Sequence, residues 1–150
     1  MTQVSHYVKT PAASRKVNFT YQNTKMSIAT DLGHVTDETF QLLQNSKFVM
    51  LESNYDPEVL RCCSYPYLLK SRIAGPKGHL SNSLAGKTIS KLIDSGLTSA
   101  MLGHLSKETN FPELAYHTVL EEMQASHHSS KAIDLFIANR LGPTKLVEIA

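Results

Sequence analysis

Polar side chains follow three predicted strands at the point where each strand ends. They are Asp31, Glu52 and His104, and each comes directly after a short apolar or alternating run. In α/β sheets, ligand-binding and catalytic groups collect at the carboxyl ends of strands. His79 lies in a glycine-flanked loop before a predicted helix, where an imidazole and free backbone N–H groups could meet the same anionic substrate. The sequence therefore indicates one polar site built from these four residues.

This set of side chains suggests metal-assisted hydrolysis. His, Asp and Glu without cysteine ligands suit zinc or manganese. An aspartate can bridge two ions, each neutral histidine can donate one ring nitrogen, and such sites activate water as a nucleophile.

Simpler interpretations stay open for each of the four. Asp31 before Leu-Gly is also typical of a turn. His104 could be a buried histidine with satisfied hydrogen bonds, Glu52 a helix-entry cap and His79 a surface loop residue. The other histidines of the later chain are interpreted as structural or solvated: His34, His117, His127 and His128.

The elements that must position these residues alternate between strand and helix. Hydrophobic periodicity predicts strands over 15–21, 26–30, 48–51, 99–102, 133–139 and 145–149, with residues 1–14 as loop. Capping residues and prolines predict helix starts at Thr36 or Asp37, Pro57, Tyr67, Ser81 or Asn82, and Pro112. This order favours a layered α/β architecture.

Composition excludes several classes of protein. The chain has 150 residues, of which 41% are hydrophobic and 19% charged, with 15 basic and 13 acidic side chains. These values exclude a disordered chain, a collagen-like chain and a disulfide-stapled mini-protein. The net charge of +2 is too small to indicate nucleic-acid binding by itself. The N-terminus has no signal-peptide pattern and no apolar run reaches membrane-spanning length, so we expect a cytoplasmic protein without a membrane partner.

Four motifs occur in an order that resembles a known family. They are Ala29-Thr30-Asp31-Leu32-Gly33, Leu51-Glu52-Ser53-Asn54-Tyr55-Asp56, Gly78-His79-Leu80-Ser81-Asn82 and Gly103-His104-Leu105-Ser106-Lys107-Glu108-Thr109-Asn110. Over nearly the whole chain this resembles the C-terminal half of metallo-β-lactamase-fold hydrolases, in the branch of the YycJ/WalJ (VicX) type. The resemblance implies a single partial domain over residues 1–150, with one mixed sheet and flanking helices from an αβ/βα sandwich.

The resemblance also implies roles for individual residues. It makes Asp31 the bridge between two divalent ions, zinc or manganese, and His104 a ligand of one of them. His6 is the candidate for a further ligand, although the residues after it depart from the acidic and small types that the family has there. The tRNA 3′-processing endonucleases share a similar motif order, which implies that Glu52 orients His79. His79 would then protonate the leaving oxygen or clamp a phosphate.

The same motifs imply contacts with a nucleic acid or another phosphodiester substrate. The candidates are Asn54, Tyr55, Ser81 and Asn82. Related sequences have histidine where this chain has Tyr55, whose hydroxyl can still donate a hydrogen bond to phosphate. A further basic patch near His79 is conceivable, but its members are scattered and a solvated face is the simpler interpretation: Lys70, Arg72, Lys77 and Lys87.

One expected motif is absent from the sequence. His-x-His-x-Asp-His, which supplies the remaining ligands in the family, does not occur. Each ion would keep two protein donors, with Asp31 counted twice, whereas a catalytic zinc normally has about three. We therefore expect weak metal binding and little or no hydrolysis by this chain alone.

The sheet that the resemblance implies would leave its inner face uncovered, beyond what a monomer usually tolerates. Three explanations stay open: a separate N-terminal half-domain chain covers this face, the chain self-associates through it, or the chain is a truncated gene product of marginal stability. Two functions stay open: the C-terminal portion of a metal-dependent phosphodiesterase or nuclease, and a non-catalytic remnant or dimerising module that keeps the fold.

Overall fold

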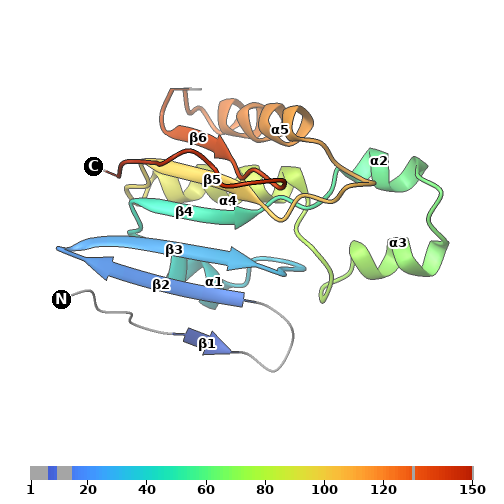
Figure 1. Ribbon diagram of the computed structural model, residues 1–150, viewed down its shortest axis with the longest axis horizontal. Coiled ribbons are helices and arrows are strands. Elements are labelled where there is room, and N and C mark those ends of the chain that lie inside the picture. The colour runs from blue at the N-terminus through green and yellow to red at the C-terminus, as the bar shows by residue number, and fades with distance from the viewer. Residues whose placement is uncertain (1–6, 10–14, 130, 150) are drawn as a thin grey trace.

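Six strands form one mixed sheet in the computed structural model, which describes residues 7–9, 15–129 and 131–149 (Figure 1). The strands are β1 (Tyr7–Lys9), β2 (Arg15–Tyr21), β3 (Thr24–Thr30), β4 (Phe48–Glu52), β5 (Ser99–Gly103) and β6 (Asp134–Ile137). They lie side by side in sequence order. The first three strands are antiparallel, and β3 to β6 are parallel. The predicted α/β class with one mixed sheet and flanking helices is confirmed.

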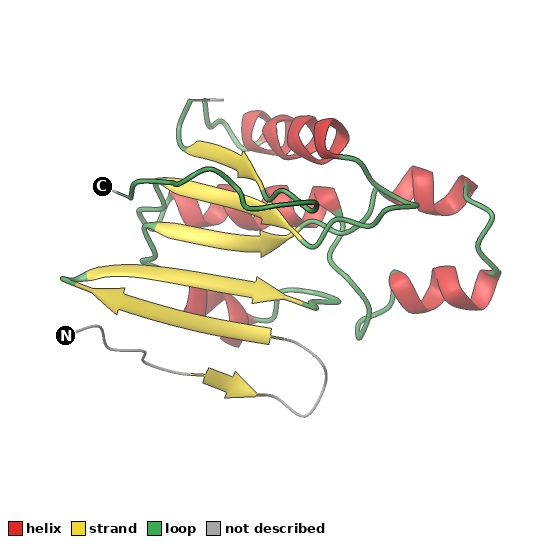
Figure 2. Cartoon of the chain, in the orientation of Figure 1, coloured by secondary structure: helices red, strands yellow, loops and turns green. Residues whose placement is uncertain are grey.

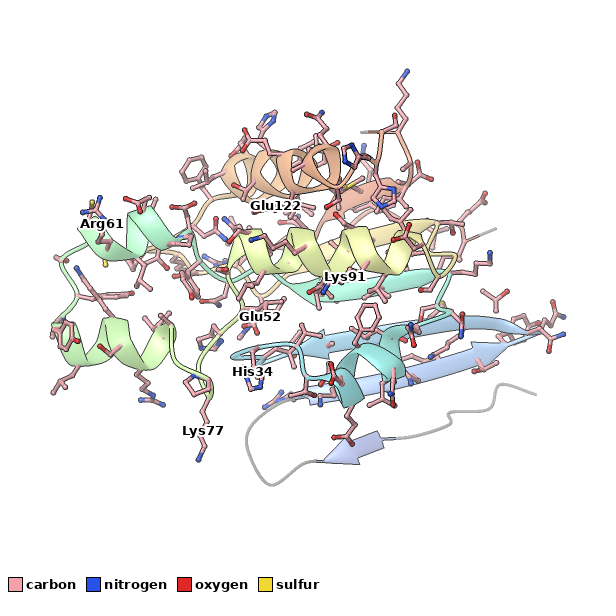
Figure 3. All side chains as sticks on the ribbon, turned by 180° about the vertical axis from the view of Figure 1, so that it is seen from behind. His34, Glu52, Arg61, Lys77, Lys91 and Glu122 are labelled. Atoms are coloured by element: carbon pink, nitrogen blue, oxygen red, sulfur yellow. The ribbon has the colours of Figure 1, made fainter. Side chains whose placement is uncertain are left out.

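Three of the helices lie on one face of the sheet. The helices are α1 (Asp37–Leu43), α2 (Pro57–Cys62), α3 (Tyr67–Ile73), α4 (Asn82–Ile93) and α5 (Pro112–Ala125). Figure 1 shows α1 and α4 behind the sheet, and the view from behind in Figure 3 brings both in front of it. Helix α5 packs against α4 and β6. Helices α2 and α3 lie beyond the carboxyl ends of the parallel strands (Figure 2).

Local capping chemistry explains where the helices begin. Thr36 and Ser81 precede α1 and α4, and each side-chain hydroxyl accepts a hydrogen bond from a backbone N–H of the first turn. Asp56 caps α2 in the same way, with Pro57 in the first helical position. Such caps satisfy N–H groups that have no partner within the helix. Pro112 starts α5, so these predicted starts are confirmed.

Alternation along the strands separates the two faces of the sheet. The helix-facing positions of the central strands are completely buried: Ala29, Val49, Leu51, Ala100 and Leu102. They form the core together with apolar residues of α4 and α5, including Ile89 and Val119. Burial of such side chains from water is the main stabilising term for this layer.

The opposite face of the sheet carries a row of apolar side chains that we call the open face. Pairing registers align Val17, Ile28, Met50, Met101 and Phe136 across five strands. All five are only half-buried. No helix of the described chain covers them (Figures 1 and 3). The segment after β6 runs in front of β5 on this side (Figures 1 and 2), so the open face has an apolar centre that no helix covers and that this segment crosses in part.

The structure corrects two sequence predictions about the chain ends. Residues 7–9, predicted as loop, form β1, whose three residues are too short to show an alternating pattern. Residues 145–149, predicted as a strand, pair with no strand, and Leu146 is 93% exposed. The apolar side chains of this segment follow a strand-like pattern in sequence, but they do not pack into the core. No helix in the described segments has the length and apolarity needed to cross a bilayer.

Candidate metal and phosphodiester site

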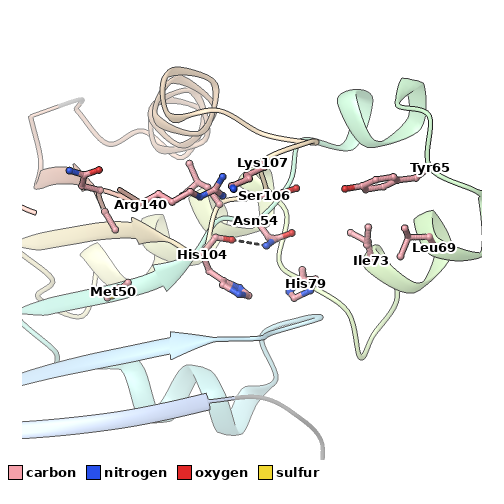
Figure 4. Close-up of a pocket in the computed structure, with 13 residues that line it drawn as sticks. Met50, Asn54, Tyr65, Leu69, Ile73, His79, His104, Ser106, Lys107 and Arg140 are labelled. Carbon is pink, nitrogen blue, oxygen red and sulfur yellow. Dashed lines mark hydrogen bonds between the residues drawn. The ribbon is translucent and has the colours of Figure 1, made fainter. Parts of the chain in front are cut away.

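Parallel pairing brings the predicted strand-end residues together. Strands β3, β4 and β5 are adjacent and parallel, so their carboxyl ends meet at one edge of the sheet. Asp31 follows β3, Glu52 ends β4 opposite Gly103, and His104 follows β5. His79 joins them from the loop between α3 and α4 (Figure 4). Potential ligand atoms of the four residues all lie within 4.8 Å of one another.

Glu52 is the centre of this cluster. Its carboxylate is completely buried, and Oε1 lies 2.7 Å from Nδ1 of His79 and 2.6 Å from Nδ1 of His104. The backbone N–H of Leu32 donates to Oε2 at 2.6 Å. One carboxylate thus fixes both imidazole rings, whose centroids are 5.2 Å apart. Sequence reasoning anticipated the contact with His79 and missed the one with His104, because that contact depends on which strands are neighbours.

Electrostatics define which nitrogens carry protons. Burial raises the pKa of Glu52, but hydrogen bonds from His104, His79 and the Leu32 N–H outweigh it, so this pKa is below its ordinary value. An ionised carboxylate only accepts hydrogen bonds. Both Nδ1 atoms must therefore donate to it, which leaves Nε2 of each ring as the free nitrogen.

The pKa of His104 also departs from its ordinary value. The hydrogen bond to Glu52 raises the pKa of His104, burial opposes the rise, and the negative charges of Glu52 and Asp31 add to it. Nε2 of His104 lies 3.8 Å from Oδ1 of Asp31.

Two glycines allow the loop that carries His79 to approach the sheet. A Cβ on Gly78 would lie 2.1 Å from the carbonyl oxygen of Ile73, and one on Gly33 would lie 2.1 Å from that of Pro76. The backbone N–H of His79 donates to the Ile73 carbonyl at 2.8 Å. Close backbone approach at both glycines therefore sets the distance between His79 and Glu52.

Asp31 and His104 share an uncommon backbone conformation. Their φ angles are 57° and 58°, in the left-handed region. Non-glycine residues in this region are uncommon and cost conformational energy, although Asp and His occur there more often than other types. Each strand therefore turns sharply at the residue whose side chain enters the cluster.

The donor set fits a divalent cation. Both Glu52 oxygens are already occupied by the two imidazoles and a backbone N–H, so Glu52 is not itself a free ligand. Asp31 and the free Nε2 of His104 are the partly exposed donors, with 26% and 42% of their side chains accessible. A histidine that donates its other ring N–H to a carboxylate is the usual arrangement around protein-bound metals. Tetrahedral zinc bonds would place such atoms about 3.4 Å apart, close to the observed separation.

The predicted substrate-binding residues occupy two different environments. Asn54 lines the cleft in front of the histidines, where its side chain donates to the carbonyl of His104 at 2.6 Å. Tyr55 is 6% exposed, and its pKa is raised by burial and by the charge of Glu52. Ser81 caps α4, and Asn82 is completely buried. His6 lies outside the described residues.

Asn82 belongs to a buried amide network. Its Oδ1 accepts hydrogen bonds from Ser53 Oγ at 2.7 Å and from Asn110 Nδ2 at 2.8 Å. Asn110 Nδ2 also donates to the carbonyl of Ser53 at 2.9 Å. The network ties together the three loops that leave β4, precede α4 and follow β5. Ser81 and Asn82 therefore support the loops around the site through the cap of α4 and the buried amide network.

A cleft of about 770 Å³ opens in front of the two histidines (Figure 4). His79, His104 and Asn54 line it together with two exposed cations, Lys107 and Arg140. Sequence analysis missed both cations as site residues. Lys107 lies within a quoted motif and could have been found from its spacing to His104, whereas Arg140 is far away in sequence. The four basic residues considered from sequence do not line this cleft.

Comparisons with known proteins show which proteins the chain is similar to. The chain is 34% identical over 120 residues to a protein named exodeoxyribonuclease WalJ from Streptococcus pneumoniae, covering 80% of this chain and 44% of that protein. It is 30% identical over 129 residues to exodeoxyribonuclease YycJ from Bacillus anthracis, covering 85% of this chain and 49% of that protein. This chain is a homologue of the WalJ/YycJ proteins. It spans a little under half the length of these relatives, and no protein-family model matches it.

Solved structures identify the fold. The metallo-β-lactamase fold protein YhfI from Bacillus subtilis superimposes with a TM-score of 0.55 at 13% identity, over 92% of this chain and 49% of that protein. Zinc-bound PqqB from Methylobacterium extorquens gives a TM-score of 0.50 at 13% identity, over 97% of this chain and 47% of that protein. The chain thus shares the fold of about half of a metallo-β-lactamase-fold protein, as its motifs predicted.

Proposed function

We propose that this WalJ/YycJ homologue is part of a divalent-metal-dependent phosphodiesterase that acts on nucleic acid. The observation that carries the proposal is the buried Glu52 carboxylate, which aligns two imidazoles beside Asp31 at one sheet edge. The relatives named exodeoxyribonuclease support nucleic acid as the substrate class. The identity of the ion, zinc or manganese, is part of the proposal.

Each residue has a distinct chemical task in this proposal. Asp31 and Nε2 of His104 hold the ion, which when bound would polarise a phosphoryl oxygen and activate water. Glu52 is a positioning residue, because both of its oxygens are used to orient other groups. His79 lines the cleft, and when it is protonated at both ring nitrogens its Nε2–H would pass a proton to the leaving oxygen or donate a hydrogen bond to a phosphate oxygen.

The donor count supports a composite site. Among the described residues of this cluster, we assign two as metal ligands, Asp31 and His104, and keep His79 for the substrate. A catalytic zinc normally has three protein ligands. We propose that the remaining ligands come from outside these residues, with His6 as one candidate and a separate half-domain chain as another source. Alone, the chain would bind metal weakly and hydrolyse little.

A second function is supported by the same count. A homologue that keeps the fold but not the chemistry would also show too few metal donors. In that case, Asp31 and His104 would stabilise the sheet edge only through their contacts with Glu52 and Arg15.

Thermal unfolding with and without zinc or manganese separates the two functions. The phosphodiesterase proposal expects metal to raise the midpoint temperature of the wild type, and expects His104→Ala and Asp31→Ala to abolish this rise. His117→Ala, at an exposed α5 position away from the cluster, serves as the control and should keep it. Equal metal responses in all four proteins would contradict the proposal and favour the non-catalytic function.

Hydrolysis is tested by reconstitution. Mixing the chain with the remaining portion of a WalJ relative should give metal-dependent cleavage of an oligonucleotide. A folded, metal-loaded mixture without cleavage would contradict the enzymatic function.

A further inference from the structure

The cleft in front of the histidines continues into a second hollow. The first cleft measures about 770 Å³ and the second about 430 Å³, and they share six lining residues. Lys107 and Arg140 line both hollows, so they stand where one passes into the other. The two hollows therefore form one groove that starts at His79 and His104 and runs between these cations.

The groove has a one-sided charge. The residues that line the two hollows include Lys107, Arg140 and the two histidines, but no aspartate or glutamate. Both cations are exposed, and neither forms an ion pair with a carboxylate of the described residues. A groove with cations and no anions raises the local concentration of phosphate groups.

Backbone contacts hold both cations in place. Lys107 follows Ser106, whose N–H donates to the carbonyl of Asn54 at 2.8 Å. Arg140 follows β6, where the N–H of Ala138 donates to the carbonyl of Leu102 at 2.8 Å and that of Asn139 to Thr144 Oγ1 at 3.0 Å. These bonds fix the backbone next to both residues relative to the histidine cluster, while the two charged side chains extend into the groove.

An aromatic ring lies at the far end of the groove. Phe111, which lines the second hollow, is 50% exposed. Proteins that bind single strands combine a cationic groove along the phosphates with aromatic rings on which unpaired bases stack. In a duplex the base faces are already stacked on each other, so Phe111 favours a single strand.

We propose that Lys107 and Arg140 bind neighbouring phosphates of a single nucleic-acid strand, whose bases reach Phe111 and whose next phosphate lies at His79 and His104. This inference rests on the proposed function for the position of the last phosphate. It adds the path of the strand away from the reacting phosphate and the residues that grip it.

Binding without metal tests the strand path. Fluorescence anisotropy would follow labelled short oligothymidylate and oligouridylate as they bind the full chain over a range of salt concentrations. Lys107→Ala/Arg140→Ala should weaken binding roughly tenfold and reduce the salt slope by about 1.4, since each phosphate contact to a single strand contributes about 0.7. Phe111→Ala should weaken binding with the salt slope unchanged, because stacking releases no counterions.

Lys87→Ala/Lys91→Ala is the matched control. It removes the same two charges from exposed positions of α4, on the helix-covered side of the sheet (Figure 3). Equal losses in both double variants, or no strand binding by the wild type, would overturn the strand path. Binding of either oligothymidylate or oligouridylate supports the strand path. Comparing the two affinities shows whether the groove prefers the DNA strand or the RNA strand.

A separate measurement keeps the two proposals distinguishable. Hydrolysis of bis(p-nitrophenyl) phosphate by the reconstituted wild type reports on the histidine cluster with a substrate that has no neighbouring phosphates. Its absence would contradict the proposed function, while the metal-free binding data would still decide the strand path.

Discussion

Glu52 serves two histidines with a single oxygen atom. That oxygen receives Nδ1–H of His79 and of His104, while its partner oxygen receives a backbone N–H. Because the carboxylate is completely buried, water cannot replace any of these donors. Fixing both rings in advance is the kind of preorganisation that the proposed phosphodiester cleavage would require.

Glu52→Gln should destabilise the protein by about 1–3 kcal/mol. The amide oxygen can still accept from the imidazoles, but the new NH₂ group faces the Leu32 N–H, so two donors meet in a buried space. Urea unfolding followed by circular dichroism measures the change. Glu121→Gln, at an exposed position of α5, is the control and should stay within about 0.5 kcal/mol of wild type. An unaltered Glu52→Gln protein would show that the three hydrogen bonds do not stabilise the fold.

The pair of Glu52 and His104 should give the metal-free protein a stability maximum in mildly acidic solution. The pKa of His104 is raised by its bond to Glu52, so its contribution is complete below the ordinary value of 6.5 and is lost as pH rises through the folded value. The net pKa of Glu52 is lowered, so its contribution is present above 4.5 and is lost as pH falls through the folded value.

Unfolding free energies measured across this pH range test the assignment. His104→Ala should remove the decline on the alkaline side, whereas His117→Ala should keep it. The same decline in both variants would assign the effect to another group.

At the scale of elements, the carboxyl ends of β3, β4 and β5 and the loop between α3 and α4 position the cluster residues. Alternating and apolar patterns predicted the strands that deliver Asp31, Glu52 and His104, because each short run is bounded by turn residues. The same patterns carry no information on strand order. The contact between Glu52 and His104 follows only from the pairing of β4 with β5.

The parts that sequence analysis missed share a physical cause. Arg140 reaches the cleft through tertiary packing of the segment after β6, and no local pattern reports such packing. The motif predicted that Asn82 contacts substrate, and the structure places its amide in a buried network. A polar residue in a motif can thus support the loops of a site through buried hydrogen bonds without being exposed in the site itself.

Gly78→Ala should displace the loop that carries His79. The added Cβ would meet the Ile73 carbonyl at 2.1 Å, and a backbone atom cannot rotate away. We expect a loss of stability of about 1–3 kcal/mol and loss of the Nδ1 proton resonance of His79, measured by unfolding and by NMR. Gly142→Ala is the control, since its nearest neighbour lies at an ordinary 3.7 Å. An intact His79 resonance in Gly78→Ala would show that the loop tolerates the shift.

At the scale of the whole molecule, the open face distinguishes this chain from a closed two-layer fold. One face of the sheet is covered by α1 and α4, whereas the other presents Met50 and Met101 at its centre. Large apolar patches on a protein surface indicate an interface. We propose that a second layer covers this face, either from a separate half-domain chain or from a second copy.

Met101→Lys should weaken whatever association the open face supports. A charge at the centre of the row must be desolvated when a second layer packs on it. Sedimentation velocity over a range of protein concentrations should show self-association of the wild type and a shift towards monomer in the variant. Leu68→Lys, at an 81% exposed position of α3, controls for added charge. Identical sedimentation of both variants and wild type would exclude association of copies through this face.

The left-handed backbone at Asp31 and His104 has a consequence for protein engineering. Both residues bear a conformational cost that glycine would not. Replacing Asp31 by glycine would remove that cost together with a proposed metal donor, whereas His104→Gly would also remove the hydrogen bond to the buried Glu52. A screen for thermal stability alone would therefore act against the proposed site at Asp31, while at His104 the bond to Glu52 opposes the gain.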